Sequence, residues 1–388
     1  MILTGPTWGS GLHAARSVAA AGGSSIVVTV GAEGSRVFGR SHWVARAVDV
    51  TGDPAAFDRE LVDLLEGLVP QGPSVVLPTS DRLLGALHRN RDRFGERFAL
   101  AIPPPEATER FLDKASANAA ARSAGLDVLP TVSVVTSGDI EEAVSLAERD
   151  RVIIRPSRVD GRGQPFKIEV VRGPEHARRV LTGLVADGVP VVVQRHLAVE
   201  PGAVEFALSW TDRRGARTDV VCGRKRRQTS VDGGVMVWGE TADLPDVASA
   251  ARRLVSATGF SGVGGLEVIR SAGRCWFVEW NARLEAIHFL ATAAGVDLVG
   301  LAYREHAGLP LPPVRPAGRA SAWVGAAFLD QLRSPAGRST AAGDWWRFQR
   351  APGRVRAVWS WRDPRPGLGL LALLGRGALG RHRRDGAG

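Results

Sequence analysis

The first hundred residues alternate between short apolar runs and helical segments, and this alternation constrains the fold more than any other feature. Ile2 to Thr4 is an apolar run that ends in a glycine-rich turn. A helical pattern over 12–21 follows, and Ser25 to Thr29 is a second apolar run. Strand, glycine turn, helix and strand in this order are typical of a doubly wound α/β unit. The sequence therefore predicts an N-terminal Rossmann-like domain with a parallel sheet over residues 1–105.

Composition limits the remaining classes of protein. Of the 388 residues, 44% are hydrophobic and 23% are charged, which is ordinary for a globular chain and excludes global disorder. The two cysteines, Cys222 and Cys275, form no C-x-x-C motif, so neither a disulfide framework nor a thiolate zinc site is expected. No apolar run reaches the ~18 residues that a membrane span needs. We expect a cytoplasmic protein.

The strongest chemical signal lies on two consecutive predicted strands that pair with each other. Because strand side chains alternate between faces, Glu279, Asn281 and Arg283 project from one face. If Glu267 on the preceding strand lies opposite, two carboxylates and an amide oxygen converge, which suits Mg²⁺. Residue spacing alone leaves open an exposed face on which Glu279 and Arg283 form a surface ion pair.

This strand pair resembles the metal-binding end of the ATP-grasp superfamily, and it is especially similar to the carboxylate-amine ligases near carbamoyl-phosphate synthase and the D-amino-acid ligases. The resemblance extends over residues 1–310, and several short motifs occur in the order expected of this superfamily. These motifs are Leu112-Asp113-Lys114, Val152-Ile153-Ile154-Arg155-Pro156, Val191 to Leu197, Gly202 to Phe206, Gly264 to Glu267 and Glu279-Trp280-Asn281-Ala282-Arg283.

The resemblance implies an α/β architecture of the α+β ATP-grasp type. A two-lobed ATP-grasp fold follows the Rossmann-like substrate domain of residues 1–105. Residues 106–190 form the small lobe, residues 191–312 form the large lobe with the metal site, and residues 313–388 form a basic, Trp-rich C-terminal appendage.

The resemblance also assigns roles to single residues. Lys114 and Arg155 bind the phosphates of ATP, Arg155 and Arg283 act in catalysis, and Arg283 stabilises an oxyanion. The adenine lies over a hinge that contains Gln194 and Leu197. The remaining implied roles are a ribose contact for Glu205 and Mg²⁺ (or Mn²⁺) ligation by Glu267, Glu279 and Asn281.

These residues predict an ATP-dependent ligase that forms an amide or peptide bond through an acyl phosphate. Its expected substrates are a small-molecule carboxylate and an amine, both of amino-acid-like chemistry. Phosphoryl transfer needs cations and alignment more than covalent chemistry from the protein, which these side chains would supply. The alternatives are a carbamoyl-phosphate-type ligase that uses bicarbonate or ammonia and a catalytically weak ATP-binding module.

Two departures from the family pattern keep the last alternative open. Arg155 stands where a lysine is usual, and arginine differs from lysine in reach and geometry at a phosphate. Lys167 on the following strand could compensate. The loop expected to cover the phosphates over 157–164 contains only two glycines, Gly161 and Gly163.

Three weaker signals lie outside these motifs. Thr79, Ser80 or Asp81 can cap a helix at the end of a predicted strand, where open α/β sheets bind ligands. The basic run 224–227 is a secondary site candidate, with a solvated strand end as its default interpretation. His288 is interpreted first as a structural histidine, and as a proton shuttle second.

The C-terminal fifth of the chain carries the whole net charge. Residues 315–388 contain 14 Arg and 4 Asp without Lys or Glu, which gives 14 − 4 = +10 and leaves residues 1–314 neutral. A strand-and-helix appendage packed on the core is the preferred interpretation, and weak contact with a membrane surface is the alternative. No nucleic-acid partner is predicted, and a homodimer is the expected assembly. Five of the eleven tryptophans lie here: Trp323, Trp345, Trp346, Trp359 and Trp361.

Overall fold

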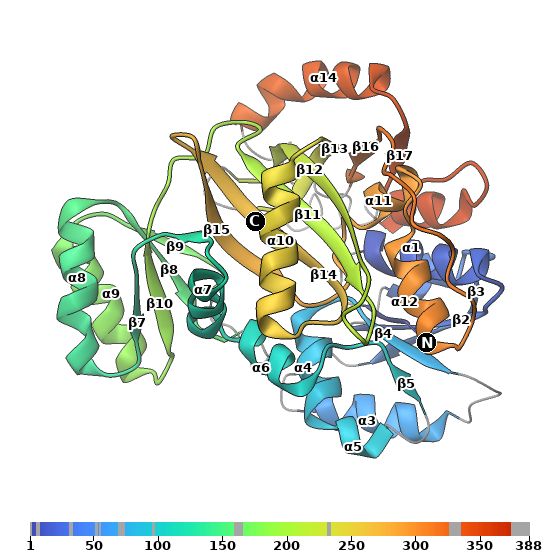
Figure 1. Ribbon diagram of the computed structural model, residues 1–388, viewed down its shortest axis with the longest axis horizontal. Coiled ribbons are helices and arrows are strands. Elements are labelled where there is room, and N and C mark those ends of the chain that lie inside the picture. Colours follow the sequence, from blue (N-terminus) through green and yellow to red (C-terminus); the bar gives the residue numbers. More distant parts are fainter. Residues whose placement is uncertain are drawn as a thin grey trace, which may run out of the picture.

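The protein contains three β-sheets with helices packed against them (Figure 1). One sheet belongs to the N-terminal segment, a small sheet projects to one side, and a large sheet forms the centre. The structure is a computed structural model that describes residues 2–4, 8–30, 34–50, 53, 56–68, 74–94, 98–158, 166–230, 234–325 and 335–373. None of the helices in these ranges combines the length and the apolar character needed to cross a membrane.

The N-terminal sheet has five parallel strands in the order β3-β2-β1-β4-β5, which confirms the predicted doubly wound unit. Its central strands are buried, as expected for a sheet covered by helices on both faces. The strands are β1 (Ile2–Thr4), β2 (Ser25–Val30), β3 (Val44–Val50), β4 (Val75–Pro78) and β5 (Ala99–Leu100). The helices are α1 (Trp8–Ala20), α2 (Gly34–Phe38), α3 (Phe57–Gly67), α4 (Asp81–Arg89) and α5 (Arg91–Phe94).

The small sheet is antiparallel, with the order β7-β10-β8-β9. Two helices cover it, and their buried residues join a separate apolar core built from this unit. The small sheet is therefore stabilised by its own apolar contacts. Its elements are β7 (Thr131–Val134), α8 (Ile140–Arg149), β8 (Val152–Pro156), β9 (Glu169–Val171), α9 (Pro174–Ala186) and β10 (Val191–Arg195).

The large sheet has eight strands in the order β17-β16-β13-β12-β11-β14-β15-β6. The predicted hairpin is confirmed as the antiparallel pair β14 (Gly262–Ser271) and β15 (Arg274–Asn281). The other strands are β6 (Asp127–Val128), β11 (Val204–Thr211), β12 (Thr218–Gln228), β13 (Met236–Thr241), β16 (Ser321–Trp323) and β17 (Arg354–Arg356). The helices nearby are α10 (Pro245–Thr258), α11 (Phe289–Ala293) and α12 (Leu298–His306).

The sequence predicts one helix over 111–124, whereas the structure contains two. The helix α6 (Pro105–Leu112) ends at Asp113, and α7 (Lys114–Ser123) begins directly after it. The break occurs because Asp113 adopts an extended backbone and its carboxylate accepts a hydrogen bond from the backbone N–H of Ser116, at 2.8 Å. Lys114 is thereby placed at the first position of α7.

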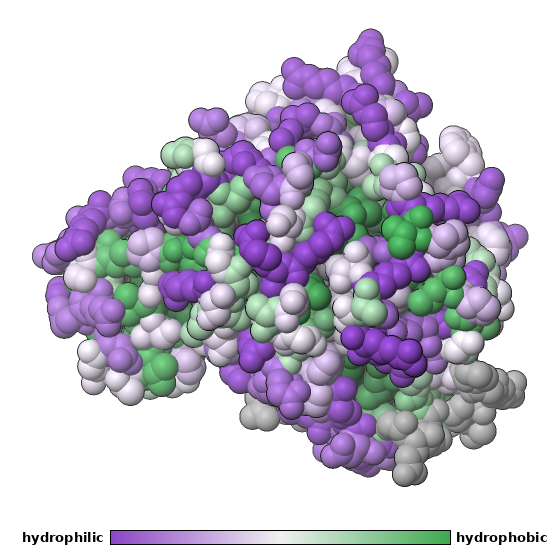
Figure 2. Space-filling model, viewed as in Figure 1, coloured by the Kyte–Doolittle hydropathy of each residue, from purple (hydrophilic) through white to green (hydrophobic). Residues whose placement is uncertain are grey.

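The C-terminal appendage continues the large sheet. Its strand β16 pairs with β13, and β17 pairs with β16 in parallel. The helix α14 (Pro335–Arg350) packs through Trp345 and Phe348 onto Trp323 of β16, and a last helix begins at residue 365. Apolar residues of the N-terminal sheet, the large sheet and the appendage share one buried core. Hydrophilic residues dominate the face of the molecule seen in Figure 2.

A buried carboxylate fastens the appendage to the N-terminal domain. The side chain of Asp363 has no exposed surface and lies 3.4 Å from Arg16 Nη2 on α1. It also accepts hydrogen bonds from Ser41 Oγ at 2.7 Å and from the backbone N–H of His42 at 3.4 Å. All these partners lie more than 300 residues away in sequence, so this carboxylate joins two ends of the chain.

Replacing this carboxylate should weaken the fold. In Asp363→Ala, the largely buried Arg16 guanidinium loses its counter-ion, and we expect the free energy of unfolding to fall by roughly 3 kcal/mol. Urea denaturation followed by tryptophan fluorescence measures this change. The matched control is Glu141→Ala, which breaks the exposed ion pair with Arg178 and should leave the urea midpoint in place. Equal midpoints for both variants would contradict a fastening role for Asp363.

Candidate functional site

Two carboxylates lie directly opposite each other on the large sheet. Glu267 of β14 pairs with Glu279 of β15. Two residues further along β15, Asn281 pairs with Gly265. Directly paired residues in an antiparallel sheet share a face, so the two carboxylates point to the same side. The two carboxylates share a face as the alternation predicts, and both side chains are partly buried. The Asn281 amide turns its Nδ2 toward Glu279 and its oxygen toward Arg283.

Basic side chains from three elements surround these carboxylates. Lys225 of β12 is buried, and its ammonium group contacts the Glu267 carboxylate. Arg155, at 5% exposure, comes from β8 of the small sheet, and Lys114 comes from the start of α7. Burial alone would raise the pKa of Glu279, but the positive charges of Arg155 and Lys114 lower it overall. The cluster therefore holds Glu279 ionised.

The start of α7 is tied to the end of β8, which brings Lys114 close to Arg155. The backbone N–H of Lys114 donates to the carbonyl of Ser157 at 2.8 Å. Ser157 Oγ in turn donates to the Asp113 carboxylate at 2.7 Å. Burial, and then the nearby Arg155 charge, lower the pKa of Lys114. Two cations are thus held side by side, which favours an anionic ligand between them.

A cavity of about 110 Å³ opens between the small sheet and the large sheet. Its polar wall contains Arg155, Lys225, Glu267 and Glu279, and its far end contains residues of the predicted hinge. The hinge and apolar lining consists of Gln194, His196, Leu197, Ile153, Val204 and Ile269. Of the predicted site residues, Arg155, Gln194, Leu197, Glu267 and Glu279 line this cavity. Lys114 and Asn281 line a smaller neighbouring cavity, which Glu279 also lines.

A relay of hydrogen bonds holds Arg155 in place. Arg155 Nη2 donates to Gln194 Oε1 at 3.0 Å, and Gln194 Nε2 donates to Thr131 Oγ1 at 3.0 Å. Thr131 then donates to the carbonyl of Leu129 at 2.8 Å. The Arg155 Nε group is buried and has no hydrogen-bond partner among the described residues. A buried donor without a partner costs free energy, so this group is poised for a ligand acceptor.

Arg283 reaches the N-terminal domain. Its Nε and Nη2 groups donate to the two carboxylate oxygens of Asp81 at 3.0 and 2.8 Å. Nη2 also donates to Asn281 Oδ1 at 3.1 Å. Burial would lower the pKa of Arg283, but the adjacent Asp81 carboxylate raises it. Asp81 occupies the first turn of α4, whose N-cap is Ser80, so the predicted ligand-binding helix end lies at the same cavity as the predicted metal ligand Asn281.

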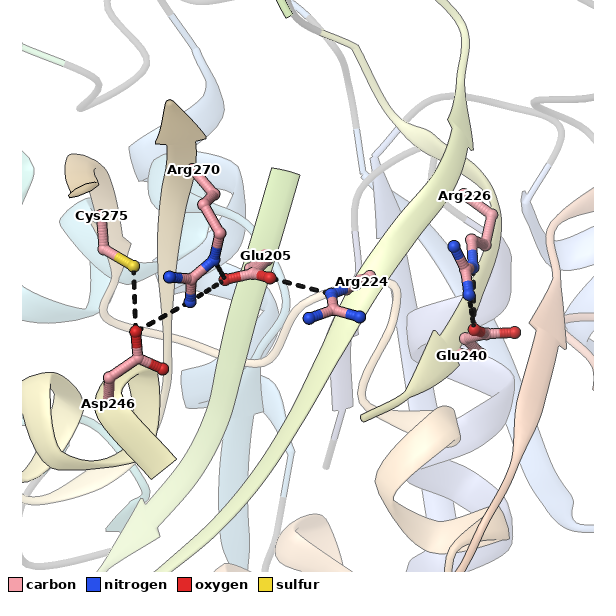
Figure 3. A network of polar contacts seen from close by, with 7 residues as sticks. All are labelled: Glu205, Arg224, Arg226, Glu240, Asp246, Arg270 and Cys275. Atoms are coloured by element: carbon pink, nitrogen blue, oxygen red, sulfur yellow. Dashed lines mark hydrogen bonds and ion pairs between the residues drawn. The ribbon is translucent and has the colours of Figure 1, made fainter. Parts of the chain in front are cut away.

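Glu205 lies on the face of the large sheet opposite to Glu267, because the next residue, Phe206, is the one that pairs with Glu267. Figure 3 shows Glu205 between arginines of the neighbouring strands. Val204 lines the cavity, and the next residue on a strand points the other way. The Glu205 carboxylate accepts from Arg224 Nε and Arg270 Nε, both at 2.8 Å. Arg270 also contacts Asp246 on α10. The structure does not bring Glu205 to the cavity, and its ribose contact stays a prediction.

Three residues at the candidate site were not predicted to belong to it from the sequence. Lys225 appeared only as part of a basic run, Asp81 only as a helix cap, and Glu285 not at all. Burial raises the pKa of Glu285 to about 8, and the Glu267 charge adds to this rise although Arg283 opposes it. One signal could have found Lys225: the chain has only three lysines, and Lys167 and Lys225 line the cavity while Lys114 lies beside it. Residues 159–164 of the phosphate cover predicted over 157–164 lie outside the described residues.

The donor set fits a hard divalent cation. Glu267, Glu279 and Asn281 supply two carboxylates and an amide group on one edge of the sheet. Asn281 Nδ2 donates to Glu279 Oε1 at 3.2 Å and to Glu285 Oε2 at 3.0 Å, so the amide is already fixed between carboxylates. Burial is the main cause of the raised pKa of Glu285 and the Glu267 and Glu279 charges add to it, so a divalent cation nearby would favour the ionised carboxylates. Oxygen ligands of this kind are those that Mg²⁺ prefers.

Comparison with known proteins finds a sequence relative and many structural neighbours. The chain is 26% identical over 245 residues to a biotin carboxylase from Haemophilus influenzae, a match that covers 58% of this chain and 53% of that protein. The chain thus spans about half the length of this curated relative. No protein-family model matches the chain.

Several solved structures share the fold. Biotin carboxylase from Campylobacter jejuni, in a β-γ-ATP complex, aligns with a TM-score of 0.60 and 17% identity over 80% of this chain and 72% of that chain. N5-carboxyaminoimidazole ribonucleotide synthetase from Thermus thermophilus aligns with a TM-score of 0.60 and 19% identity over 83% and 82%. The biotin carboxylase domain of a Hydrogenobacter thermophilus 2-oxoglutarate carboxylase aligns with a TM-score of 0.62 and 17% identity over 82% and 71%. That domain is a dimer with MgADP, ADP and bicarbonate.

Two buried histidines behind the site should make the protein sensitive to acid. Burial lowers the pKa of His13 from 6.5 to about 4, and burial together with His13 lowers the pKa of His288 to about 3. The unfolded chain therefore binds these protons at a higher pH than the folded chain. Each histidine makes the free energy of unfolding fall by about 1.4 kcal/mol per pH unit as the pH drops below 6.5.

Glu285 acts in the opposite direction over the same range, because its raised pKa makes the folded chain the better proton acceptor. A comparison with His13→Gln isolates one histidine. Between pH 6.5 and 5, we expect the advantage of the native protein over this variant to shrink by about 1.4 kcal/mol per pH unit. Urea unfolding at a series of pH values measures it. A difference that does not change with pH would contradict a neutral, buried His13.

Proposed function

The chain has the ATP-grasp fold, and from this premise we propose that it is an ATP- and Mg²⁺-dependent enzyme that phosphorylates bicarbonate and transfers the carboxyl group to a nitrogen nucleophile. The observation that carries the proposal is the cluster of Glu267 and Glu279 with Arg155 and Lys225 at one cavity, with Lys114 beside it. Carboxylates for a metal and cations for phosphates are what ATP-dependent phosphoryl transfer needs.

The sequence motifs predict an amide-forming ligase, with a ligase that uses bicarbonate as an alternative. The relatives favour this alternative. The sequence relative is named a biotin carboxylase, and one neighbour holds MgADP together with bicarbonate. Formation of an amide or peptide bond remains the second candidate, because the motifs resemble those of the carboxylate-amine ligases. Both reactions begin with phosphorylation of a carboxylate, so the two candidates differ in which carboxylate enters.

In the first step, a bicarbonate oxygen attacks the γ-phosphorus of ATP, the bond to the β-γ bridging oxygen breaks, and carboxyphosphate and ADP form. Lys114 and Arg155 bind the non-bridging oxygens of the transferred group. Glu267, Glu279 and Asn281 would hold Mg²⁺, which would supply positive charge at the phosphates. The Lys225 ammonium beside Glu267 supplies a further buried cation on the cavity wall.

In the second step, the nitrogen attacks the carboxyl carbon and inorganic phosphate leaves. Arg283 donates toward the oxyanion that develops at this stage, and Asp81 fixes its guanidinium through two hydrogen bonds. The N-terminal domain thereby orients a catalytic group of the large sheet. A proton leaves the attacking nitrogen as the new carbon–nitrogen bond forms.

Nucleotide binding requires the small sheet to move. The cavity of about 110 Å³ is smaller than the several hundred Å³ of typical ligand sites. The small sheet has its own apolar core and carries Arg155 and Gln194 as one unit. Rotation of this unit away from the large sheet opens the cavity without exposing either core.

Bicarbonate should stimulate release of ADP. With ATP and Mg²⁺, we expect ADP formation in bicarbonate-containing buffer to exceed that in carbon-dioxide-free buffer. Glu279→Gln should lower the stimulated rate by on the order of 10² to 10³, because one oxygen ligand and its charge are lost. A coupled assay for ADP measures both rates. The matched control is Glu141→Gln on the exposed side of the small sheet.

The outcome separates the three candidate functions. Stimulation by organic acids with amines, and not by bicarbonate, would replace carboxylation with amide formation. Tight ATP binding without turnover under either condition would favour a nucleotide-binding module. An unchanged rate in Glu279→Gln would contradict the assigned metal site.

Arg155 should act through both its charge and its shape. Arg155→Met removes the cation beneath the phosphates, and we expect the stimulated rate to fall by on the order of 10². Arg155→Lys keeps the charge but loses the guanidinium fork that binds Gln194, so a smaller loss of about tenfold is expected. Arg151→Met, at an exposed position just before β8, is the matched control. Equal rates for the lysine and methionine variants would show that charge at this position is irrelevant.

A further inference from the structure

The appendage has an apolar groove that the proposed reaction does not use. The groove has a volume of about 550 Å³ and lies between α14 and the helix that begins at 365. Trp345 from α14 forms one wall, Leu370 and Leu371 from the last helix form the other, and Trp323 lies at the base with Trp359. Among the described residues that line it, none carries a carboxylate or amide side chain, and the polar group at its border is Arg356.

Large apolar side chains continue from the groove onto the surface. Trp361 is 82% exposed and packs edge to face on Trp359, with ring centroids 5.4 Å apart. Leu371 and Leu368 of the last helix are 60% and 52% exposed. Protein surfaces commonly expose single apolar residues, but a contiguous apolar area of this kind marks an interaction site.

The same region is strongly cationic because its acidic groups are used internally. Asp344 is buried and lies 2.7 Å from Arg227 of the large sheet, and Asp363 faces Arg16. Asp363 therefore cannot offset the exposed arginines of the appendage, whereas Asp344 also lies 3.7 Å from the exposed Arg347 and offsets part of its charge. The exposed arginines include Arg347, Arg350, Arg354, Arg362 and Arg365.

We propose that this face, formed by the groove, Trp361, Leu368, Leu371 and the neighbouring arginines, docks the protein onto an anionic lipid bilayer. Tryptophan and leucine insert at the boundary between headgroups and acyl chains, and arginines pair with anionic headgroups. The charge complementarity selects a negatively charged partner. This inference is independent of the proposed reaction.

Two other occupants fit the same face less well. A second copy meeting this face across a two-fold axis would place two arginine-rich surfaces against each other, and like charges oppose that contact. A nucleic acid would match the charge and stack on Trp361, but it offers little to Leu368 and Leu371. A bilayer interface accepts the aromatic, aliphatic and cationic side chains together.

Co-sedimentation with lipid vesicles tests the proposal on the full-length protein. We expect binding to vesicles of phosphatidylcholine mixed with phosphatidylglycerol, weaker binding at high salt, and little binding to phosphatidylcholine alone. Trp361→Ser combined with Leu371→Ser should lower the partition coefficient at least about tenfold, because two apolar anchors are lost. Arg362→Gln and Arg365→Gln should each lower binding to anionic vesicles about fivefold.

A matched pair of substitutions controls for general effects of exposed apolar residues. Val135→Ser combined with Val235→Ser changes exposed valines far from the appendage in sequence and should leave vesicle binding unchanged. Urea midpoints equal to that of the native protein confirm that the variants remain folded. Quenching of tryptophan fluorescence by brominated lipid, lost in Trp361→Phe, would place this side chain within the bilayer.

Several results would overturn the proposal. One is the absence of binding to anionic vesicles at low salt, and another is binding that Trp361→Ser with Leu371→Ser does not reduce. Sedimentation equilibrium in which the same variant dissociates a dimer, without vesicle binding, would assign the face to a second copy. Loss of oligonucleotide binding in that variant, again without vesicle binding, would assign it to nucleic acid.

Discussion

The structure depends on the enforced proximity of two partly buried carboxylates. Glu267 and Glu279 face each other across adjacent strands, and neither can move away because the strand register fixes both. Two like charges in a desolvated place are unfavourable unless cations or protons compensate. Lys225 compensates from the same sheet, Arg155 from the small sheet and Lys114 from the start of α7. The electrostatic requirement of one strand pair thus recruits side chains from separate parts of the fold.

The N-terminal domain takes part in this arrangement through Arg283. The bidentate contact of Arg283 with Asp81 joins residues 202 positions apart in sequence and ties the segment just after β15 to the first turn of α4. Asn281 accepts from the same guanidinium and donates to Glu279. A displacement of α4 is therefore transmitted by three hydrogen-bonded links to a carboxylate of the cluster. This geometry gives the domain a physical route by which a bound acceptor could influence the phosphate site.

Local periodicity predicted the parts of the site that depend on one strand or one hairpin. The pairing of Glu267 with Glu279 follows from alternation and a short connection, and the structure has it. The direction of Glu205 could not be read in the same way, because a shift of one residue in strand register reverses the face. The role of Lys225 was hidden for a similar reason: β12 has register shifts just after it, and such bulges have no reliable signature in a single sequence. Contacts such as Arg283 with Asp81 join distant segments and need the tertiary fold.

Arginines have two different roles in this chain, one in the candidate site and one on the surface of the appendage. The role depends on whether a carboxylate lies close enough to pair with the guanidinium group. In the site, each cation lies within a balanced, buried group, so a phosphate meets individually placed donors and not a general field. In the appendage, Asp344 pairs with Arg227 and also lies 3.7 Å from Arg347, Asp363 pairs with Arg16, and Arg350, Arg354, Arg362 and Arg365 are exposed. Asp344 and Asp363 stabilise the fold through buried ion pairs. Because these two carboxylates are buried, the exposed surface of the appendage is left positively charged. Internal neutralisation in one place therefore creates the uncompensated charge that a negatively charged surface can bind.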